Sequence, residues 1–390
     1  MRCLGGLLAL GLILAAPAHA VPDCPGTAPA RTILSGQGVL ESVIADDRGG
    51  LLYTDNSKGA LMRLDRPGGT PRQVAPLPKP GGLLLEPGGT VIAGSGNGFQ
   101  EGAIGNVSPM AKLLRIDPRT GRTTTIATGL QMANGLAYDL DRTIYGSDDV
   151  GLRGIDRFRN GRVETQWAEV TSANGLAVDR AGRYLYANQT FVPAAIARVD
   201  VRDPSRVETF ARPGPEDVSA GLDGMTIDQS DRLFSAANGA GQLWRIGTDR
   251  SICALARGLL LPSAVAFGGG GAFPATSLYA VTFSGNVVEV PRARPVPPAS
   301  ALPGTRVRLR VSPKRVRARR RVRLKLSVSF VRGRTVTPAP RARVRIGRRV
   351  VRMNRLGRRT LVRRFRRPGR VRVQVITRRR PGAAAIIRVR

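Results

Sequence analysis

The residues of this chain that could do chemistry recur at one position of a sequence repeat. Five residues before an Asp that ends an apolar run, four copies of the repeat carry an oxygen-bearing side chain: Glu41, Asn134, Asn174 and Asp223. Calcium binds oxygens from carboxylates, amide carbonyls and water, so these four would form a hard-cation site with positions left for water or a substrate. Such a cation would polarise a carbonyl or phosphoryl oxygen, with Asp223 or another nearby carboxylate as base or nucleophile.

The spacing of the copies indicates the elements that would bring these residues together. Two weaker copies place Gly81 and Ser263 in the same register, so the six copies follow one another at intervals of 40, 53, 40, 49 and 40 residues. A period of this length, with strands and turns in each unit, is typical of a propeller. Equivalent positions of its blades face one central channel. No segment shows a sustained 3.6-residue periodicity, so we predict an all-β fold with a six-bladed β-propeller.

Each of these residues also has a purely structural interpretation. Asn-Gly and Asp-Gly are common turn dipeptides, and any one copy alone would be read as a turn. A second set of polar residues recurs fourteen or fifteen positions later, and we interpret its members as turn-capping residues: Asp55, Asp148, Asn188 and Asn238. The longest interval contains an insertion, residues 95–111, which is either a lid over the channel or a surface loop.

The first 20 residues have the pattern of a secretory signal peptide. Arg2 precedes an apolar stretch that is too short to span a bilayer, and Ala18-His19-Ala20 is a cleavage site that makes Val21 the first mature residue. No other stretch has the length of a transmembrane helix, so we expect an exported protein: secreted, periplasmic or associated with the cell surface. Cleavage removes His19, the only histidine. This excludes Ser-His-Asp and Cys-His machinery and zinc sites of the usual type.

Two cysteines, Cys24 and Cys253, remain after cleavage. An exported protein meets oxidising conditions, which permit a disulfide. A propeller closes by pairing its N-terminal strand with its last blade, so a bridge between these cysteines would staple the ring. We predict that disulfide; the alternative is two unpaired thiols.

The formal charge of +35 divides the chain into two parts. Residues 301–390 contain 33 of the 62 Lys and Arg and no Asp or Glu, whereas the rest of the chain is nearly neutral. We expect a propeller over residues 21–290, a proline-rich linker over 291–304 and a basic β-sandwich over 305–390. Its strands are indicated by Arg alternating with Val or Leu at 306–311, 343–346 and 370–376. The alternative is an unfolded basic tail.

A domain this cationic would bind polyanions with strong salt dependence. For an exported protein we expect an anionic cell-envelope polymer as the partner. Specific nucleic-acid binding is disfavoured, because Phe330 and Phe365 are the only aromatic residues after residue 300. The alternative is a solvated surface in a chain that uses Arg in place of Lys throughout.

Over roughly residues 36–290 the chain resembles the SMP-30/gluconolactonase/luciferin-regenerating-enzyme-like family of six-bladed propellers, on the motifs at Glu41, Asn134, Asn174 and Asp223. The resemblance implies that Glu41, Asn174 and Asp223 bind one divalent cation on the channel axis. Asn134 would contact the metal or line the substrate site. Asp223 would be the catalytic base or nucleophile. The C-terminal part resembles small immunoglobulin-like modules.

The chain departs from the sugar-lactonase pattern in three places. Met132 and Gly135 stand where those members carry Arg and Asp, and Ser42-Val43 follows the first-blade Glu in place of Gly-Pro. The first two changes favour a more apolar ester or lactone as the small-molecule substrate. We therefore expect an exported, calcium-dependent hydrolase of lactone or ester type. The alternatives are a non-catalytic propeller that binds a ligand or partner at the channel face, and a strictosidine-synthase-like propeller without metal.

Overall fold

A computed structural model describes residues 21–86, 88–150, 154–191, 193–294, 306–332, 335–338, 342–347, 349–354, 357–376 and 384–390. The chain divides into two compact units, residues 1–295 and 296–390. The expected signal peptide, and residues 295–304 of the expected linker, lie outside the described residues. We describe each unit by itself.

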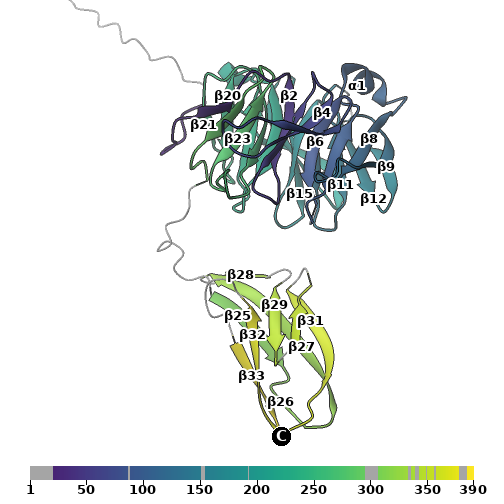
Figure 1. The fold of residues 1–390 in the computed structure, drawn as a ribbon, viewed down its shortest axis with the longest axis vertical. Helices are drawn as coiled ribbons and strands as arrows, with labels where there is room; N and C mark the ends of the chain where they lie inside the picture. The colour runs from purple at the N-terminus through teal and green to yellow at the C-terminus, as the bar shows by residue number, and fades with distance from the viewer. Residues whose placement is uncertain are drawn as a thin grey trace, which may run out of the picture. The chain divides into compact units, whose positions relative to one another are not determined.

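The first unit is a six-bladed β-propeller, as the sequence predicts (Figure 1). Each blade is a four-stranded antiparallel sheet, and the first five blades follow the chain in order. The first blade consists of β2 (Leu40–Ala45), β3 (Leu51–Asp55), β4 (Ala60–Leu64) and β5 (Arg72–Pro76), and the second of β6 (Pro80–Leu85), β7 (Val91–Ser95), β8 (Ala111–Ile116) and β9 (Thr123–Leu130). The third consists of β10 (Leu136–Tyr138), β11 (Ile144–Ser147), β12 (Ile155–Arg159) and β13 (Arg162–Ala168), and the fourth of β14 (Ala173–Val178), β15 (Tyr184–Gln189), β16 (Ala195–Asp200) and β17 (Asp203–Ala211). The fifth consists of β18 (Leu222–Ile227), β19 (Leu233–Ala237), β20 (Gln242–Ile246) and β21 (Ile252–Ala256).

The sixth blade closes the ring by combining the two ends of the unit. It consists of β22 (Pro262–Phe267), β23 (Leu278–Thr282), β24 (Val287–Val290) and, as its outermost strand, β1 (Arg31–Leu34). The first strands of the blades contact one another in sequence around the ring, and β22 contacts β2 to complete it. Every blade therefore presents its first strand to one central channel.

The middle strands of the blades are apolar because both of their faces are covered. All five residues of β3, β19 and β23 are buried, since each blade packs between its two neighbours. The largest fully buried side chains include Trp244, Tyr53, Tyr145 and Tyr279. Outer strands such as β17 are exposed over most of their length and keep charged residues. The buried middle strands hold the first strand of each blade in a fixed position, and these first strands carry the polar side chains at the channel.

The predicted disulfide between Cys24 and Cys253 is present, with the two Cα atoms 4.9 Å apart. Cys253 lies in β21, the outer strand of the fifth blade, whereas β1 completes the sixth blade. The bridge therefore tethers the segment before β1 to the neighbouring blade. The disulfide supplements the pairing of β1 with β24, which closes the ring.

The structure differs from the all-strand expectation within the insertion at 95–111. This segment contains a short helix, α1 (Phe99–Gly105), between β7 and β8. Gly98 is its N-cap residue and makes no side-chain cap bond. A seven-residue helix without caps produces almost no periodic signal, so sequence periodicity could not find it. In the structure, an ion pair of Lys79 Nζ with Glu101 Oε1 at 2.5 Å ties the helix to the residue that precedes the second blade.

The second unit is a β-sandwich of two sheets. The first contains β25 (Arg306–Ser312), β27 (Arg321–Arg332), β28 (Thr335–Pro338) and β31 (Arg358–Arg364); the second contains β26 (Arg315–Val316), β33 (Ala384–Val389), β32 (Gly369–Ile376), β29 (Arg343–Ile346) and β30 (Arg349–Arg352). Alternate residues point inward, as in β29, where Val344 and Ile346 are buried and Arg343 and Arg345 are exposed. The buried residues form one apolar core. Among the described residues of either unit, no helix is long and apolar enough to span a membrane.

Candidate metal and substrate site

The predicted polar residues lie where the inner strands leave regular pairing. In β2, β14 and β18 the register with the next strand shifts between Leu40 and Val43, Ala173 and Leu176, and Leu222 and Met225. Glu41, Asn174 and Asp223 fall inside these three irregularities, and Asn134 lies just before β10. A bulge redirects a side chain that would otherwise alternate with the pleat. These residues are thus released from the strand's regular alternation at one end of the channel.

The glycine after Asn134, Asn174 and Asp223 is required by close packing of the blades. Asn174-Gly175 and Asp223-Gly224 lie inside strands, and none of Gly135, Gly175 and Gly224 has a positive φ. A Cβ on Gly135 would overlap the carbonyl oxygen of Asn174, and one on Gly224 would lie 2.7 Å from the carbonyl oxygen of Ser263. Each glycine therefore allows the next blade to approach. The turn interpretation is therefore wrong for Asn174-Gly175 and Asp223-Gly224.

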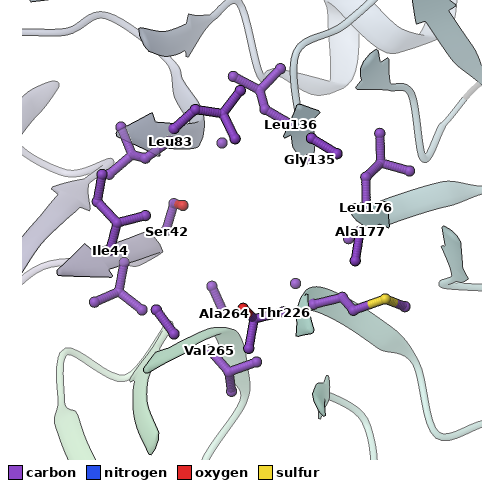
Figure 2. Close-up of a pocket in the computed structure, with 18 of the residues that line it drawn as sticks. Ser42, Ile44, Leu83, Gly135, Leu136, Leu176, Ala177, Thr226, Ala264 and Val265 are labelled. Carbon is purple, nitrogen blue, oxygen red and sulfur yellow. The ribbon is translucent and has the colours of Figure 1, made fainter. Parts of the chain in front are cut away.

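Two cavities meet at the four predicted residues. A wide cavity of about 840 Å³ opens at the mouth of the channel, and a narrower one of about 330 Å³ continues along its axis. The described lining residues that the two share are Glu41, Asn134, Asn174 and Asp223. Beyond them the channel is mostly apolar: Figure 2 shows Ile44, Leu83, Leu136, Leu176 and Val265 around it, with Ser42 and Thr226 as polar interruptions. The four residues therefore separate a solvent-open mouth from an apolar interior.

Three carboxyl groups at this junction oppose each other's ionisation. Burial, followed by the charge of Asp149, raises the pKa of Glu41 to about 8. Burial, followed by the charges of Glu41 and Asp149, raises the pKa of Asp223 well above its ordinary value. Burial also raises the pKa of Asp149. A cluster of buried acids without a cation favours the protonated forms, and a bound cation would reverse this.

The amide groups at the junction leave acceptor oxygens unused. The Asn174 Nδ2 donates to Asp149 Oδ2 at 3.3 Å and to Thr190 Oγ1 at 3.1 Å. The Asn174 Oδ1 and the Asp149 Oδ1 are buried and have no hydrogen-bond partner among the described residues. Buried acceptors are nearly always satisfied, so such oxygens indicate an absent donor or cation. The donor chemistry fits a hard, oxygen-preferring cation.

Carboxylates alone do not complete such a site. The described part of the chain contains no group of three or more His, Cys, Asp or Glu side chains arranged to hold a metal ion. Coordination of a cation at this junction would therefore draw on the amide oxygens of Asn134 and Asn174 as well.

Sequence reasoning missed further residues at the site. Asp149, which follows β11, accepts a hydrogen bond from Asn174 Nδ2 at 3.3 Å, and its charge raises the pKa values of Glu41 and Asp223. Asn97, from the insertion, lines the mouth, and its side chain counteracts the rise in the pKa of Glu41. The signal for Asp149 was its place beside Asp148 at the end of a predicted strand. Asn97 has no signal beyond its location in the insertion.

The interpretation of the second polar set as turn caps is wrong for two members. The Asn238 Nδ2 lies 3.4 Å from Asp223 Oδ2, and Asn238 lines the mouth. The Asn188 Nδ2 donates to the backbone carbonyl of Asp223 at 2.5 Å. Both residues therefore hold Asp223 in position. Asp55 does cap a turn, because it accepts from the backbone N–H of Lys58 at 3.1 Å.

Apolar side chains surround the mouth. Phe99 of α1 and Phe191 of the β15–β16 connection line it, although their side chains are 79% and 57% exposed. Phe283, Met132 and Val150 line the same cavity. Large exposed apolar groups around a polar centre are typical of a ligand-binding rim.

The fold and the ring of oxygens define a six-bladed propeller with a candidate cation site at the channel mouth. The family model described as the SMP-30/Gluconolactonase/LRE-like region matches residues 146–282, so the resemblance inferred from the sequence is confirmed. No curated protein matches the chain.

Solved structures extend the likeness to the whole propeller. A gluconolactonase from Xanthomonas campestris has 18% sequence identity and a TM-score of 0.54, over 71% of this chain and 99% of that one. A luciferin-regenerating enzyme has 16% identity and a TM-score of 0.52, over 68% and 95% of the two chains. A calcium-binding protein, regucalcin, from Agrobacterium tumefaciens has 16% identity and a TM-score of 0.52, over 68% and 93%. At these identities the likeness establishes the fold.

Proposed function

We propose that the protein is a calcium-dependent hydrolase of lactone or ester type. The observation that carries this proposal is the set of four oxygen-bearing residues at the junction of the two cavities. They combine charged and neutral oxygen donors, and the mouth leaves them open to a small molecule. The likeness to the gluconolactonase and regucalcin structures supports the same reading.

Glu41, Asn134, Asn174 and Asp223 would hold the cation. The two carboxylates would supply the charge, and the unpartnered Oδ1 of Asn174 would supply a neutral ligand. When bound, a divalent cation would polarise a substrate carbonyl and stabilise the oxyanion that develops. Its positive charge would also keep Glu41 and Asp223 ionised at neutral pH, where their pKa values would otherwise favour protonation.

Asp223 is the residue we assign to proton transfer or nucleophilic attack. As a base it would take the proton of a water molecule as that water attacks the carbonyl carbon. The carbon–oxygen bond of the lactone or ester then breaks, and the departing oxygen takes up a proton. As a nucleophile it would form an acyl-enzyme that water hydrolyses. Asn238 and Asn188 hold its carboxylate and backbone in place. Asp149 is a second carboxylate that would be able to act as base or nucleophile at this site.

The mouth favours a substrate with an apolar group. Met132 is buried in its wall. At Gly135, where the sugar-lactonase pattern has Asp, an added side chain would overlap the carbonyl of Asn174. No side chain at these two positions offers a charge to sugar hydroxyls. Phe99 and Phe191 instead offer apolar surface to an acyl or aryl group.

The protein acts outside the cytoplasm in this proposal, with its second unit binding an anionic polymer of the cell envelope. The basis is the leader-like sequence at 1–20 and the 33 basic residues after residue 300. In β25, for example, Arg308 and Arg310 are both exposed and lie two residues apart along the strand. Exposed cations at about 7 Å spacing along a strand match a polymer with regularly spaced anionic groups.

The test is hydrolysis of a panel of lactones and esters by the chain from Val21 to Arg390, with calcium and then with a chelator. We expect turnover that the chelator abolishes and calcium restores. Measurable calcium binding without turnover on any substrate would favour a ligand-binding propeller. No calcium binding would remove the metal assignment.

A further inference from the structure

The backbone nitrogen of Val21 forms a buried contact with a carboxylate nearly 200 residues away. It donates a hydrogen bond to Asp217 Oδ2 at 2.8 Å. The exposed fractions of Val21 and Asp217 are only 6% and 7%. Val21 also belongs to the apolar core of the fourth and fifth blades, together with Leu222.

Asp217 lacks a countercharge in this position. It ends the short helix η1 (Pro215–Asp217), and its own backbone bonds are made with Gly214 and Ala220. Among the described residues no Lys or Arg forms an ion pair with it. The guanidinium of Arg257 contacts the carbonyl of Val21, but its carboxylate partner is Asp23, whose Oδ1 lies 2.7 Å from the Arg257 Nε. A carboxylate buried against one neutral N–H is unfavourable unless a positive group pairs with it.

The expected leader cleavage would create that positive group at the contacting atom. Ala18-His19-Ala20 directly precedes Val21. Hydrolysis of the Ala20–Val21 peptide bond adds water, leaves a carboxylate on Ala20 and gives Val21 an α-amino group. A free α-amino group has a pKa of about 7.7–8.0 and is largely protonated at neutral pH. We propose that Asp217 is the binding site for the α-ammonium group of Val21, formed when the leader is removed.

The ion pair would fix the segment that leads to the candidate site. Val21 and the residues after it run along the fifth blade, where Ala254 N donates to Pro22 O at 2.7 Å and Cys24 N to Ala254 O at 2.8 Å. On the other side, Asp217 belongs to the connection between β17 and β18. Ser219 and Gly221 of that connection line the mouth, and β18 carries Asp223. Removal of the leader would therefore fix the β17–β18 connection through the ion pair between Val21 and Asp217. The inference does not depend on the proposed hydrolase activity.

The decisive experiment compares two forms of the chain, one starting at Val21 and one that retains Ala20. In the second form Val21 keeps its N–H but carries no charge. Each is made with Asp217 and with Asp217→Asn, and the Tm of all four is measured. We expect the Val21 form to melt higher by about 2–6 °C when Asp217 is present, and the difference to vanish in Asp217→Asn. Glu216→Gln, an exposed neighbour in the same helix, is the control and should preserve the difference.

Equal Tm values for the two wild-type forms would overturn the proposal, as would a difference that persists in Asp217→Asn. A second measurement needs no variant and holds if Asp217→Asn does not fold. Acylation of the native chain with an amine-reactive ester, followed by mass spectrometry, should modify Val21 at least tenfold more slowly than Lys58, whose side chain is 46% exposed. Modification of Val21 at a rate equal to that of Lys58 would exclude a buried ion pair. N-terminal sequencing of the exported protein should begin at Val21, and another start would also overturn the assignment.

Discussion

The two units of this protein use polar residues in opposite ways. In the propeller, acidic and basic residues nearly balance, and a few buried polar residues gather at one junction of cavities. In the sandwich, the basic residues have no acidic partners and lie along the exposed positions of the strands, as Arg343 and Arg345 do in β29. Function in the first unit should therefore depend on individual residues. Function in the second should depend on their sum.

The largest expected effect comes from Asp223→Asn. The amide keeps the size of the side chain but removes its charge and its capacity to accept a proton. We expect kcat to fall by about 10²–10⁴-fold on any substrate that the wild type hydrolyses, with the fold retained. Kinetic assays and circular dichroism measure the two effects. The control is Asp47→Asn, an exposed carboxylate outside both cavities. Undiminished turnover in Asp223→Asn would show that another group, with Asp149 the first candidate, performs the chemistry.

The next effect is a pH dependence of stability without metal. The folded-state pKa of Glu41 is about 8 against an ordinary value of 4.5, so the folded protein binds a proton more tightly than the unfolded chain. The resulting stabilisation is complete below about pH 4.5 and is lost as pH rises through about 8. The free energy of unfolding in chelator should therefore fall over that range, by up to about 1.4 kcal/mol per pH unit from this group.

Urea titrations at several pH values measure this slope. Glu41→Gln should flatten it, and calcium should reverse it, because cation binding favours the ionised carboxylate. An unchanged slope in Glu41→Gln would mean that Glu41 does not titrate in this range.

The third effect is a difference in stability between substitutions at two equivalent positions, Gly175 in the fourth blade and Ser42 in the first. A Cβ at Gly175 would overlap the backbone of Asp223, whereas Ser42, in the same register of the first blade, already carries a side chain. Gly175→Ala should destabilise the propeller by about 1–3 kcal/mol. Ser42→Ala should change the stability by less than about 0.5 kcal/mol. Equal losses in the two variants, measured by urea unfolding, would contradict the close-packing account of the repeat.

A smaller effect is expected at the rim. Phe99→Ala removes apolar surface from the mouth and should raise KM for an apolar lactone or ester roughly fivefold, which is about 1 kcal/mol of lost contact. The value of kcat should change little. Val107→Ala is the matched control, because Val107 is 85% exposed and lies outside the mouth. A KM change of the same size for a small polar lactone would argue against apolar selectivity.

The smallest effect tests the distributed character of the sandwich. Arg358→Gln should reduce the slope of log affinity against log salt concentration, for binding to an anionic polymer, by about one or less. Most of the affinity should remain. Binding to polyphosphate at several salt concentrations measures the slope. Loss of binding from this one substitution would show that the sandwich contains a discrete site and would remove the contrast with the propeller.

The repeat register explains how much of the propeller was predictable. Six copies at a period near 40 residues are enough to define the blades, and the four oxygen-bearing members meet because closure places equivalent positions around one axis. The reasoning needed no knowledge of side-chain conformation. The same argument explains the disulfide, since Cys24 lies near the start of the ring and Cys253 near its end.

The remainder of the site was not predictable for a different physical reason. Asp149 and Asn97 lie in connections that do not repeat, so no register assigns them a position. Asn238 does repeat, but a local turn and a long-range contact use the same residue types, and only the three-dimensional structure distinguishes them. The α1 helix was missed because it is too short for periodicity. Irregular connections thus carry the part of the site that a periodic argument cannot reach.

The irregular pairing in the inner strands has a consequence for how such a protein diversifies. Each blade offers one position at the junction, and the blade's core does not depend on what that position carries. In two blades the position is already withdrawn from the ring: Gly81 abuts the carbonyl of Ala133, and Ser263 Oγ donates to the carbonyl of Leu40 at 2.6 Å. These two blades flank Glu41, so the remaining three contributors stand on consecutive blades across from it. Descendants of a duplicated blade could thus acquire separate chemical roles by single exchanges while the ring itself stayed closed.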